Sequence, residues 1–377
     1  MQRHTYLELD LRRSEEYLRG SAAVLNVRDW GARGDGTSDD TAAFQHALDA
    51  AGPAGGTVLV PRGRYRFSVP LGIRGDRTEL VGLGGSRLVA ATLLDRLIDS
   101  NNFSGLRLHG LTLEGAGVQA VGGRGAIHLD EGSTGCVVSR CRILNAPGTA
   151  ITDDGRHNLV VHNVIEGTGE HGIYSSGGLD SEYHDNHLRN VGRVAGTTLG
   201  CHGISLAGST SCTVAGNTIV DTDGVGIALR DGAHHCTVRS NAISAGTDRH
   251  IALGTASDCT IIRNTLRDVA AGFDAIRIDG GGRLVIADNL IRRATAGGAG
   301  IRWTTAGVTG GDDVYGNTIV LEGAAISQPG IDADSGTLVD VRIHGNTIRA
   351  VHGAAPPGAI QVRSGARVRV YGNRTRA

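Results

Sequence analysis

Histidine, tyrosine, aspartate and arginine recur in this sequence beside regularly spaced isoleucines. His128 and Tyr174 each follow an isoleucine directly, and Arg230 is the third residue after another. Side chains of these types transfer protons or stabilise anionic groups, so a fold that aligned the isoleucines would assemble a site for acid–base chemistry. The candidate catalytic residues are His128, Asp130, Asp154, His171, Tyr174 and His202. The candidate substrate-binding residues are Arg230, Arg277, Arg302 and Asp279.

The combination suits removal of a proton next to a carboxylate, which requires a cation, a base and an acid. Arg230 would neutralise the carboxylate. Tyr174, with either His171 or His202, would form the base–acid pair. Asp130 and Asp154 would orient His128 or bind Ca²⁺, which prefers oxygen ligands.

Other interpretations of these residues stay open. Hydrolysis needs two carboxyl groups, roughly 5–5.5 Å apart for retention or roughly 6.5–9.5 Å apart for inversion, and Asp130 and Asp154 could approach the shorter separation. The side chains could also be solvated surface. A second group of arginines and aspartates could in the same way have only a structural role, in which Arg–Asp pairs stabilise stacked strands. It comprises Arg277, Asp279, Arg302, Asp332 and Asp334.

A repeat of 22 to 31 residues would position these side chains. It is marked by Ile127, Ile151, Ile173, Ile204, Ile227, Ile251, Ile276, Ile301, Ile331 and Ile360. Repeats of this length indicate a solenoid, in which equivalent residues of successive coils stack at the spacing of neighbouring β-strands. If each isoleucine points inward, the residue after it points outward. The candidate residues would then form one outward band.

Two further columns support stacking. An asparagine follows each isoleucine by about 13 residues, and its amide can bond to the asparagines above and below. This column is Asn163, Asn186, Asn217, Asn241, Asn264, Asn289, Asn317, Asn346 and Asn373. A cysteine column is expected to be an inward stack of small apolar side chains. It contains Cys136, Cys212, Cys236 and Cys259.

Composition bounds the function. Among the 377 residues, Gly numbers 59, aromatic residues make up 3%, and the formal net charge is −1, so no electrostatic attraction to nucleic acid or to an anionic membrane is expected. There is no Lys to act as a catalytic base. No CxxC pair, signal peptide or transmembrane stretch is evident, which predicts a cytoplasmic protein with reduced thiols.

The segment Leu25–Tyr65 contains Asp-Trp-Gly-Ala-Arg-Gly-Asp-Gly-Thr-Ser-Asp-Asp, then a helical stretch, then Gly-Gly-Thr-Val-Leu-Val-Pro. It resembles the start of the pectate-lyase-like β-helix superfamily, which includes mannuronan C5-epimerases, polygalacturonases and tailspike depolymerases. The helix is expected at 38–51, capped by Thr37 or Ser38, where it would plug the open end of the solenoid. The expected fold is therefore all-β: one right-handed parallel β-helix of roughly ten or more coils over residues 25–377. An extension, 1–24, would serve packing or oligomer contact.

Neither catalytic motif of these relatives carries over intact. Mannuronan epimerases have a Tyr-Gly-Phe-Asp-Pro-His run where this chain has Gly148–Asp154, which lacks both His and Tyr. The Gly-His-Gly-Ile-Ser-Ile-Gly run of polygalacturonases is similar to Cys201–Gly208, but their Arg-Ile-Lys appears as Arg277-Ile-Asp279. An insertion at 191–201 would wall a groove beside the site.

The resemblance and the residue types together predict a carbohydrate-active enzyme that abstracts a proton from a uronic-acid-containing oligo- or polysaccharide, as a lyase or C5-epimerase. The alternatives are a glycoside hydrolase with paired aspartates, a non-catalytic glycan-binding solenoid, and a cytoplasmic tailoring enzyme for a small metabolite. The sequence identifies no definite cofactor, and Ca²⁺ is compatible with the carboxylates. No nucleic-acid or membrane partner is expected. Because no cap is evident after the last coil, a homo-oligomer would cover its edge.

Overall fold

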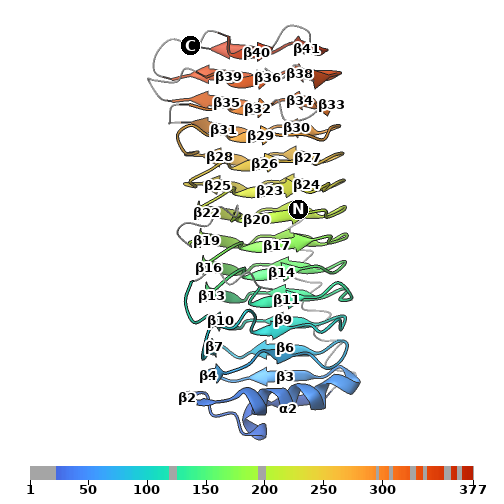
Figure 1. Ribbon diagram of the computed structural model, residues 1–377, viewed down its shortest axis with the longest axis vertical. Helices are drawn as coiled ribbons and strands as arrows, with labels where there is room; N and C mark the ends of the chain where they lie inside the picture. The colour runs from blue at the N-terminus through green and yellow to red at the C-terminus, as the bar shows by residue number, and fades with distance from the viewer. Residues whose placement is uncertain are drawn as a thin grey trace.

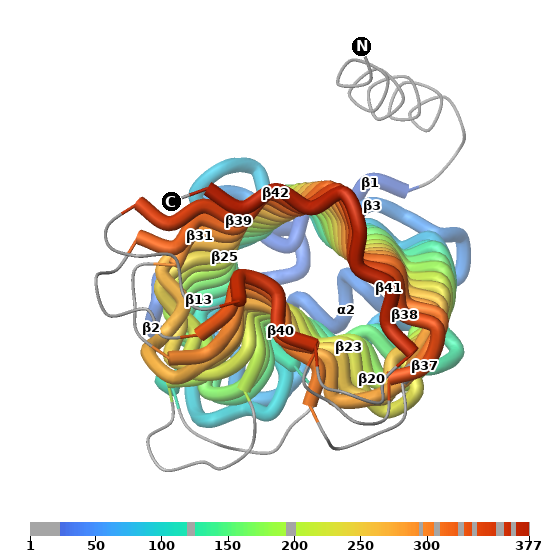
Figure 2. Tube along the Cα trace, turned by 90° about the horizontal axis from the view of Figure 1, so that it is seen from above, coloured from blue at the N-terminus to red at the C-terminus, as the bar shows by residue number. Residues whose placement is uncertain are grey.

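The computed structural model is a right-handed parallel β-helix of about twelve turns, as expected from the isoleucine repeat (Figure 1). It describes residues 23–118, 125–193, 201–293, 297–304, 309–322, 328–333, 338–351, 358–362 and 367–376. Each turn contributes one strand to each of three parallel sheets, here called A, B and C (Figure 2). The predicted extension 1–24 lies almost wholly outside the described residues.

Sheet A comprises β1 (Val24–Asn26), β3 (Thr57–Val60), β6 (Glu79–Gly82), β9 (Arg107–His109), β12 (Val137–Ser139), β15 (Leu159–Val161), β18 (Glu182–His184), β21 (Thr213–Ala215), β24 (Thr237–Arg239), β27 (Thr260–Ile262), β30 (Val285–Ala287), β34 (Asp313–Tyr315), β38 (Val341–His344) and β41 (Val368–Tyr371). Sheet B comprises β2 (Asp35–Asp39), β4 (Gly63–Phe67), β7 (Ser86–Ala90), β10 (Thr112–Glu114), β13 (Arg142–Ala146), β16 (Val164–Thr168), β19 (His187–Val191), β22 (Thr218–Thr222), β25 (Ala242–Ser244), β28 (Thr265–Arg267), β31 (Leu290–Arg293), β35 (Thr318–Leu321), β39 (Thr347–Ala350) and β42 (Arg374–Arg376).

Sheet C, which carries the candidate site, comprises β5 (Leu71–Gly72), β8 (Ile98–Asp99), β11 (Ile127–Leu129), β14 (Ile151–Asp153), β17 (Ile173–Ser176), β20 (Ile204–Ala207), β23 (Ile227–Arg230), β26 (Ile251–Leu253), β29 (Ile276–Ile278), β32 (Ile301–Trp303), β36 (Ile331–Ala333) and β40 (Ile360–Val362). A small separate pair joins β33 (Thr309–Gly310) to β37 (Leu338–Val339).

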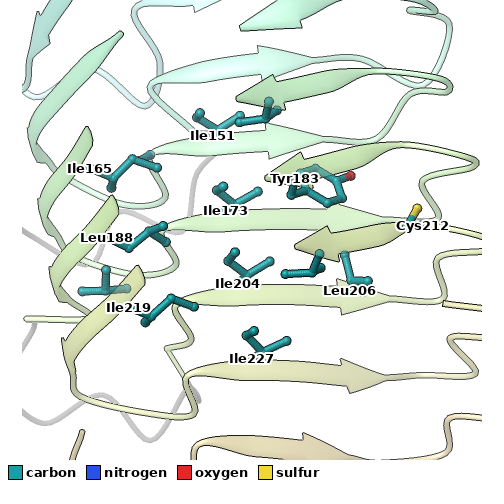
Figure 3. Close-up of a cluster of buried hydrophobic side chains, with 14 of the residues drawn as sticks. Ile151, Ile165, Ile173, Tyr183, Leu188, Ile204, Leu206, Cys212, Ile219 and Ile227 are labelled. Carbon is teal, nitrogen blue, oxygen red and sulfur yellow. The ribbon is translucent and has the colours of Figure 1, made fainter. Parts of the chain in front are cut away.

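The isoleucine column lies inside the coil, and its members are paired in register from strand to strand. Ile151 pairs with Ile173, which pairs with Ile204. Figure 3 shows these side chains stacked beside a second apolar column from sheet B. The predicted cysteine column is also buried, and all six cysteines are free. Nonpolar burial of this extent is the main stabilising contribution to the fold.

The asparagine ladder is confirmed and connects sheet A to sheet B at each turn. The side-chain oxygen of Asn241 accepts hydrogen bonds from the backbone amide of Asn217 at 2.9 Å and from its side-chain amide at 3.0 Å. The residue before each ladder position has a positive φ, for example Asp185 at 55° and Gly216 at 66°. Glycine adopts this conformation without strain, which explains the recurring Gly-Asn-Thr-Ile sequence.

One helix covers the first coil, as predicted, but it is shorter than the sequence suggested. Helix α2 runs from Thr41 to Ala51, and Phe44 packs edge-on against two aromatic side chains of β4. Two short 3₁₀ turns, Val27–Trp30 and Gly52–Ala54, flank this region. The expected start at residue 38 is wrong because Asp35–Asp39 pairs as strand β2.

The predicted helix caps are also wrong. Thr37 and Ser38 instead donate hydrogen bonds to Asp35. Asp40 is the N-cap residue, but its carboxylate accepts from the amides of Arg33 and Gly34 rather than from the helix.

Candidate functional site

The outward face of sheet C brings the candidate residues into one band. The residue after each column isoleucine faces outward, so Asp99, His128, Thr152, Tyr174 and Ser205 are successive neighbours. Adjacent strands are about 4.8 Å apart, which places His128 and Tyr174 about 10 Å apart with Thr152 between them. The band therefore divides into two clusters, where the sequence predicted one.

The histidine–aspartate cluster consists of Asp99, His128, Asp130 and Asp154. The ring of His128 is only 2% exposed, and its Nε2 lies 3.1 Å from Oδ2 of Asp154. Its Nδ1 lies 3.2 Å from Asp130 and 3.7 Å from Asp99. Asp99 also binds Arg96 at 2.7 Å. The carboxylates thus contact both ring nitrogens, as expected for groups that orient His128.

The protonation states in this cluster are set by the contacts between the imidazole of His128 and the surrounding carboxyl groups. Burial lowers the pKa of His128, but the hydrogen bonds that the ring donates to Asp154 and Asp99 and the charge of Asp130 outweigh it and raise that pKa to about 9. Burial and the neighbouring Asp99 raise the pKa of Asp130. Burial opposes ionisation of Asp99, yet hydrogen bonds from His128 and Asp130 hold its pKa well below the usual range.

The same cluster is where a metal ion would be sought. Asp99, His128 and Asp130 each offer a ligand atom, all within 4.8 Å of one another. A metal would have to displace the proton of His128, because only neutral imidazole is a ligand. The carboxylates that would hold a metal ion here are the same groups that raise the pKa of His128, so proton and metal would compete for this position.

The raised pKa predicts a loss of stability in alkaline solution. The protonated form of His128 contributes fully below pH 6.5, the unfolded pKa, and its contribution disappears as the pH rises through about 9. The free energy of unfolding should fall by about 3 kcal/mol across this range. Urea titrations at pH 6.5, 8 and 9.5 measure it, and His128→Gln should show a flatter profile. Equal slopes for the two proteins would contradict the assignment.

The tyrosine–arginine cluster consists of His171, Tyr174, His202, Ser205 and Arg230, from the β17, β20 and β23 coils. The rings of His171 and Tyr174 are stacked at 5.0 Å and 13°. The guanidinium of Arg230 lies 5.6 Å from the centre of the Tyr174 ring, and its Nε donates to Ser205 at 3.1 Å. The two histidine rings are 5.2 Å apart. These contacts join all four predicted side chains of this region.

Both histidines of this cluster are neutral near pH 7. Burial, His202 and Arg230 lower the pKa of His171 to about 3, and burial and Arg230 lower the pKa of His202 to about 4. The backbone amide of His202 donates to Nδ1 of His171 at 3.0 Å. Since a neutral imidazole carries one proton, His171 must hold it on Nε2 and act there as a donor.

The arginine–aspartate cluster (Arg277, Asp279, Arg302, Asp332 and Asp274) begins two coils beyond Arg230 and extends over β29, β32 and β36. Arg277 binds Asp279 at 2.6 Å, and Arg302 binds Asp332 at 2.9 Å. Arg302 also contacts buried Asp274 at 3.4 Å. Asp334 and most of the insertion at 191–201 lie outside the described residues. These arginines are therefore engaged by carboxylates, unlike Arg230, whose nearest carboxylate contact, to Asp231, is 3.7 Å long.

Asp99 was missed in the sequence because the visible repeat begins at Ile127. The dipeptide Ile98-Asp99 has the same pattern, an isoleucine followed by an outward polar residue, and could have extended the column by one coil. The structure also excludes Asp153 from the outward face. Asp153 points into the coil, where it accepts a hydrogen bond from Tyr183 at 2.7 Å, and burial raises its pKa.

The fold and site define a pectate lyase-like parallel β-helix. A family model described as rhamnogalacturonase A/epimerase, pectate lyase-like, matches residues 24–249, and the chain belongs to this family. A second model, described as periplasmic copper-binding protein (NosD), matches residues 193–327. Within the described residues, no helix is long and apolar enough to cross a membrane.

Known relatives share a short, closely similar segment. Mannuronan C5-epimerase AlgE3 from Azotobacter vinelandii is 64% identical over 45 residues, which are 12% of this chain and 2% of that protein. Alginate lyase 7 from the same organism is 61% identical over 44 residues, 11% of this chain and 5% of that protein. The matches therefore span a small fraction of these relatives.

Solved structures share the fold over nearly the whole chain. The A-module of Azotobacter vinelandii mannuronan C-5 epimerase AlgE6 matches with a TM-score of 0.68 and 20% identity, over 93% of this chain and 99% of that one. A family 28 exopolygalacturonase from Yersinia enterocolitica matches with a TM-score of 0.66 and 14% identity, over 94% and 78%. The surface adhesin PfbA of Streptococcus pneumoniae matches with 0.65 and 14%, over 94% and 97%. At these identities, the likeness concerns the fold.

Proposed function

We propose that the protein removes the proton next to the carboxylate of a uronic-acid residue in a glycan, as a lyase or a C5-epimerase. The observation that carries this proposal is the tyrosine–arginine cluster. It places a guanidinium, a phenol and two neutral imidazoles on adjacent coils of one outward face. The relationship of the chain to mannuronan C5-epimerases supports the proposed substrate class.

The tautomer of His171 divides the roles within the cluster. Because its Nε2 carries the proton, His171 can donate a hydrogen bond to the substrate carboxylate but cannot accept a proton there. Arg230 would bind the same carboxylate and stabilise the negative charge that develops on it. His202, neutral at pH 7, would then accept the proton from the sugar carbon, and the hydroxyl of Tyr174 would donate one.

Product analysis on a panel of uronate polymers tests the reaction type. A lyase forms an unsaturated uronate that absorbs ultraviolet light. An epimerase changes the anomeric NMR pattern without shortening the chain. Replacing Tyr174 with phenylalanine, His171 with alanine or His202 with alanine should lower either activity by about 100-fold or more. Full activity in all three variants would remove the tyrosine–arginine cluster as the site.

Hydrolysis is a second candidate because two carboxyl groups of the histidine–aspartate cluster have pKa values moved in opposite directions. The pKa of Asp130 is raised and that of Asp99 is lowered, so Asp130 is the carboxyl that suits a general acid; the two groups are hydrogen-bonded to each other and do not flank a glycosidic bond as a pair. The pair expected from the sequence was Asp130 with Asp154, but these contact opposite nitrogens of the His128 ring. A hydrolase would release reducing ends without ultraviolet absorbance, and Asp130→Asn would abolish that activity.

A further inference from the structure

Arginine side chains are concentrated on the outward face of sheet B, which the proposed chemistry does not use. From β4 to β42, the outward positions of its strands hold ten arginines and two glutamates, and one further acid, the exposed Asp221, lies at the bend of β22. The outward positions of sheet A, from β3 to β41, hold four arginines and three acidic residues. Since the whole chain has a formal net charge of −1, this face is a local excess of positive charge.

The arginines of the first coils line two hollows. One, of about 420 Å³, is lined by Arg62, Arg64 and Arg87 together with three glycines. The other, of about 230 Å³, is lined by Arg142 and Arg189 together with His187 and Glu166. Arg64, Arg87 and Arg142 belong to one register column that continues to His187. The column spans five coil spacings, or about 24 Å.

Acidic neighbours neutralise only part of this charge. Glu114 is shared by Arg64 at 3.8 Å and Arg87 at 3.3 Å. Glu166 is likewise shared by Arg142 and Arg189. Four guanidinium groups thus face two carboxylates. Arg62 makes no ion pair with any described residue. The side chains of Arg64 and Arg87 remain about half exposed, at 51% and 48%, so they can reach a ligand.

Two further carboxylates of this face lie at its first strand, and a third, Asp221 of β22, binds Arg193. Asp35 and Asp39 of β2 pair in register with Arg64 and Arg66. Hydroxyl and amide groups of Thr37 and Ser38 hold Asp35, and the hydroxyl of Ser68 together with Thr41 holds Asp39, and these hydrogen bonds keep both pKa values low. They reduce the positive charge beside the first hollow but leave the arginines of β7, β13 and β19 unopposed by further acids on these strands.

We propose that this surface, the sheet B arginine face (Arg62, Arg64, Arg87, Arg142 and Arg189), binds acidic polysaccharide at a site separate from sheet C. The coil spacing of about 4.8 Å is close to the length of one pyranose residue, so a polymer along the column brings sugar residues to the coils of β4, β7, β13 and β19 that carry the arginines. Outward positions of the sheet B strands carry no Phe, Tyr or Trp, the side chains on which nucleic-acid bases stack. The type of polymer rests on the proposed function, but the binding does not require catalysis.

Affinity electrophoresis in gels that contain polygalacturonate or polymannuronate tests this proposal without an activity assay. The variant Arg62→Gln/Arg87→Gln/Arg142→Gln should bind long polymers about tenfold more weakly, because three exposed ion pairs are lost. The matched control, Arg107→Gln/Arg239→Gln/Arg342→Gln, removes the same charge from sheet A and should bind as the unmodified protein does. Thermal melting of both variants checks that they are folded.

Three results would overturn the proposal. The first is unchanged polymer binding in the sheet B variant, or an equal loss in the sheet A control. The second is loss of all polymer binding on replacing Arg230 alone, which would leave only the sheet C site. The third is equally tight, equally arginine-dependent binding of single-stranded DNA, which would show a face for any polyanion. Absence of turnover on every polymer would instead contradict the proposed function and leave this binding measurement intact.

Discussion

Replacing Arg230 with glutamine should lower kcat/KM on the preferred uronate polymer by about 10²- to 10³-fold, or roughly 3–4 kcal/mol of transition-state stabilisation. Removing the proton beside a carboxylate places a second negative charge on the sugar, and Arg230 is the cation of the tyrosine–arginine cluster. Its Nε donates a hydrogen bond to Ser205 at 3.1 Å, so the two terminal nitrogens are the ones that would bind the substrate carboxylate. The loss should appear mainly in kcat, because the charge develops only in the transition state.

Two further variants give this prediction its control and its rescue. Arg230→Lys keeps the charge but loses the bidentate geometry, so it should recover part of the lost rate. Arg239→Gln, on the exposed outer face of sheet A, should leave the rate unchanged. Initial rates of ultraviolet absorbance measure a lyase, and time-resolved NMR measures an epimerase. If Arg230→Gln retained full activity while Asp130→Asn was inactive, the histidine–aspartate cluster would be the active site.

The stacked architecture was predictable because it depends on a single repeated spacing. Ile127 to Ile360 and Asn163 to Asn373 recur with the coil, and each column is in register in the structure. If the isoleucines point inward, strand alternation alone predicts that the residues after them, such as His128 and Tyr174, point outward. This is why the residue types of the site were found from the sequence.

Contacts within the band were not predictable, because they depend on side-chain length and on which coil each group belongs to. Thr152 stands between His128 and Tyr174 in the register, so residues expected to form one cluster form two. The pairing of Arg230 with Tyr174 spans two coils, because Arg230 is the third residue after its isoleucine and has a long side chain. The spacing of the repeat determines the column in which a residue lies, but it does not determine which side chains on other coils that residue contacts.

His250 shows a signal that the repeat contained and that went unnoticed. The residue before the column isoleucine is alanine or glycine in the other nine coils, but it is histidine before Ile251. The imidazole is 1% exposed, and burial together with Arg293 lowers its pKa to about 3. Arg293 is also buried and donates to the carbonyl groups of Gly297 and Gly298. The exception within a column of small residues marks an interior polar group, whereas the nearby Arg293 belongs to another column and could not be foreseen from this one.

Replacing Asn217 with leucine should lower the free energy of unfolding by about 3–5 kcal/mol, the effect expected for a ladder residue in the interior of the column. The side chain is fully buried and donates to the carbonyl of Tyr183 at 2.8 Å and to Asn241 at 3.0 Å. Its oxygen accepts both amide groups of Asn186. Leucine keeps the branched shape of the side chain but none of its polar atoms, so the loss would come mainly from buried polar groups left without partners, each costing about 1–3 kcal/mol.

The last rung of the same ladder provides a matched comparison. Asn373 accepts the same two hydrogen bonds from Asn346, but it is only partly buried and makes no contact with a further asparagine. Water can therefore replace part of what Asn373→Leu removes, and we expect a loss of about 1 kcal/mol. Urea denaturation followed by circular dichroism measures both variants. Equal losses at the two positions would mean that the ladder stabilises each turn locally, and that burial along the column adds nothing to the strength of its hydrogen bonds.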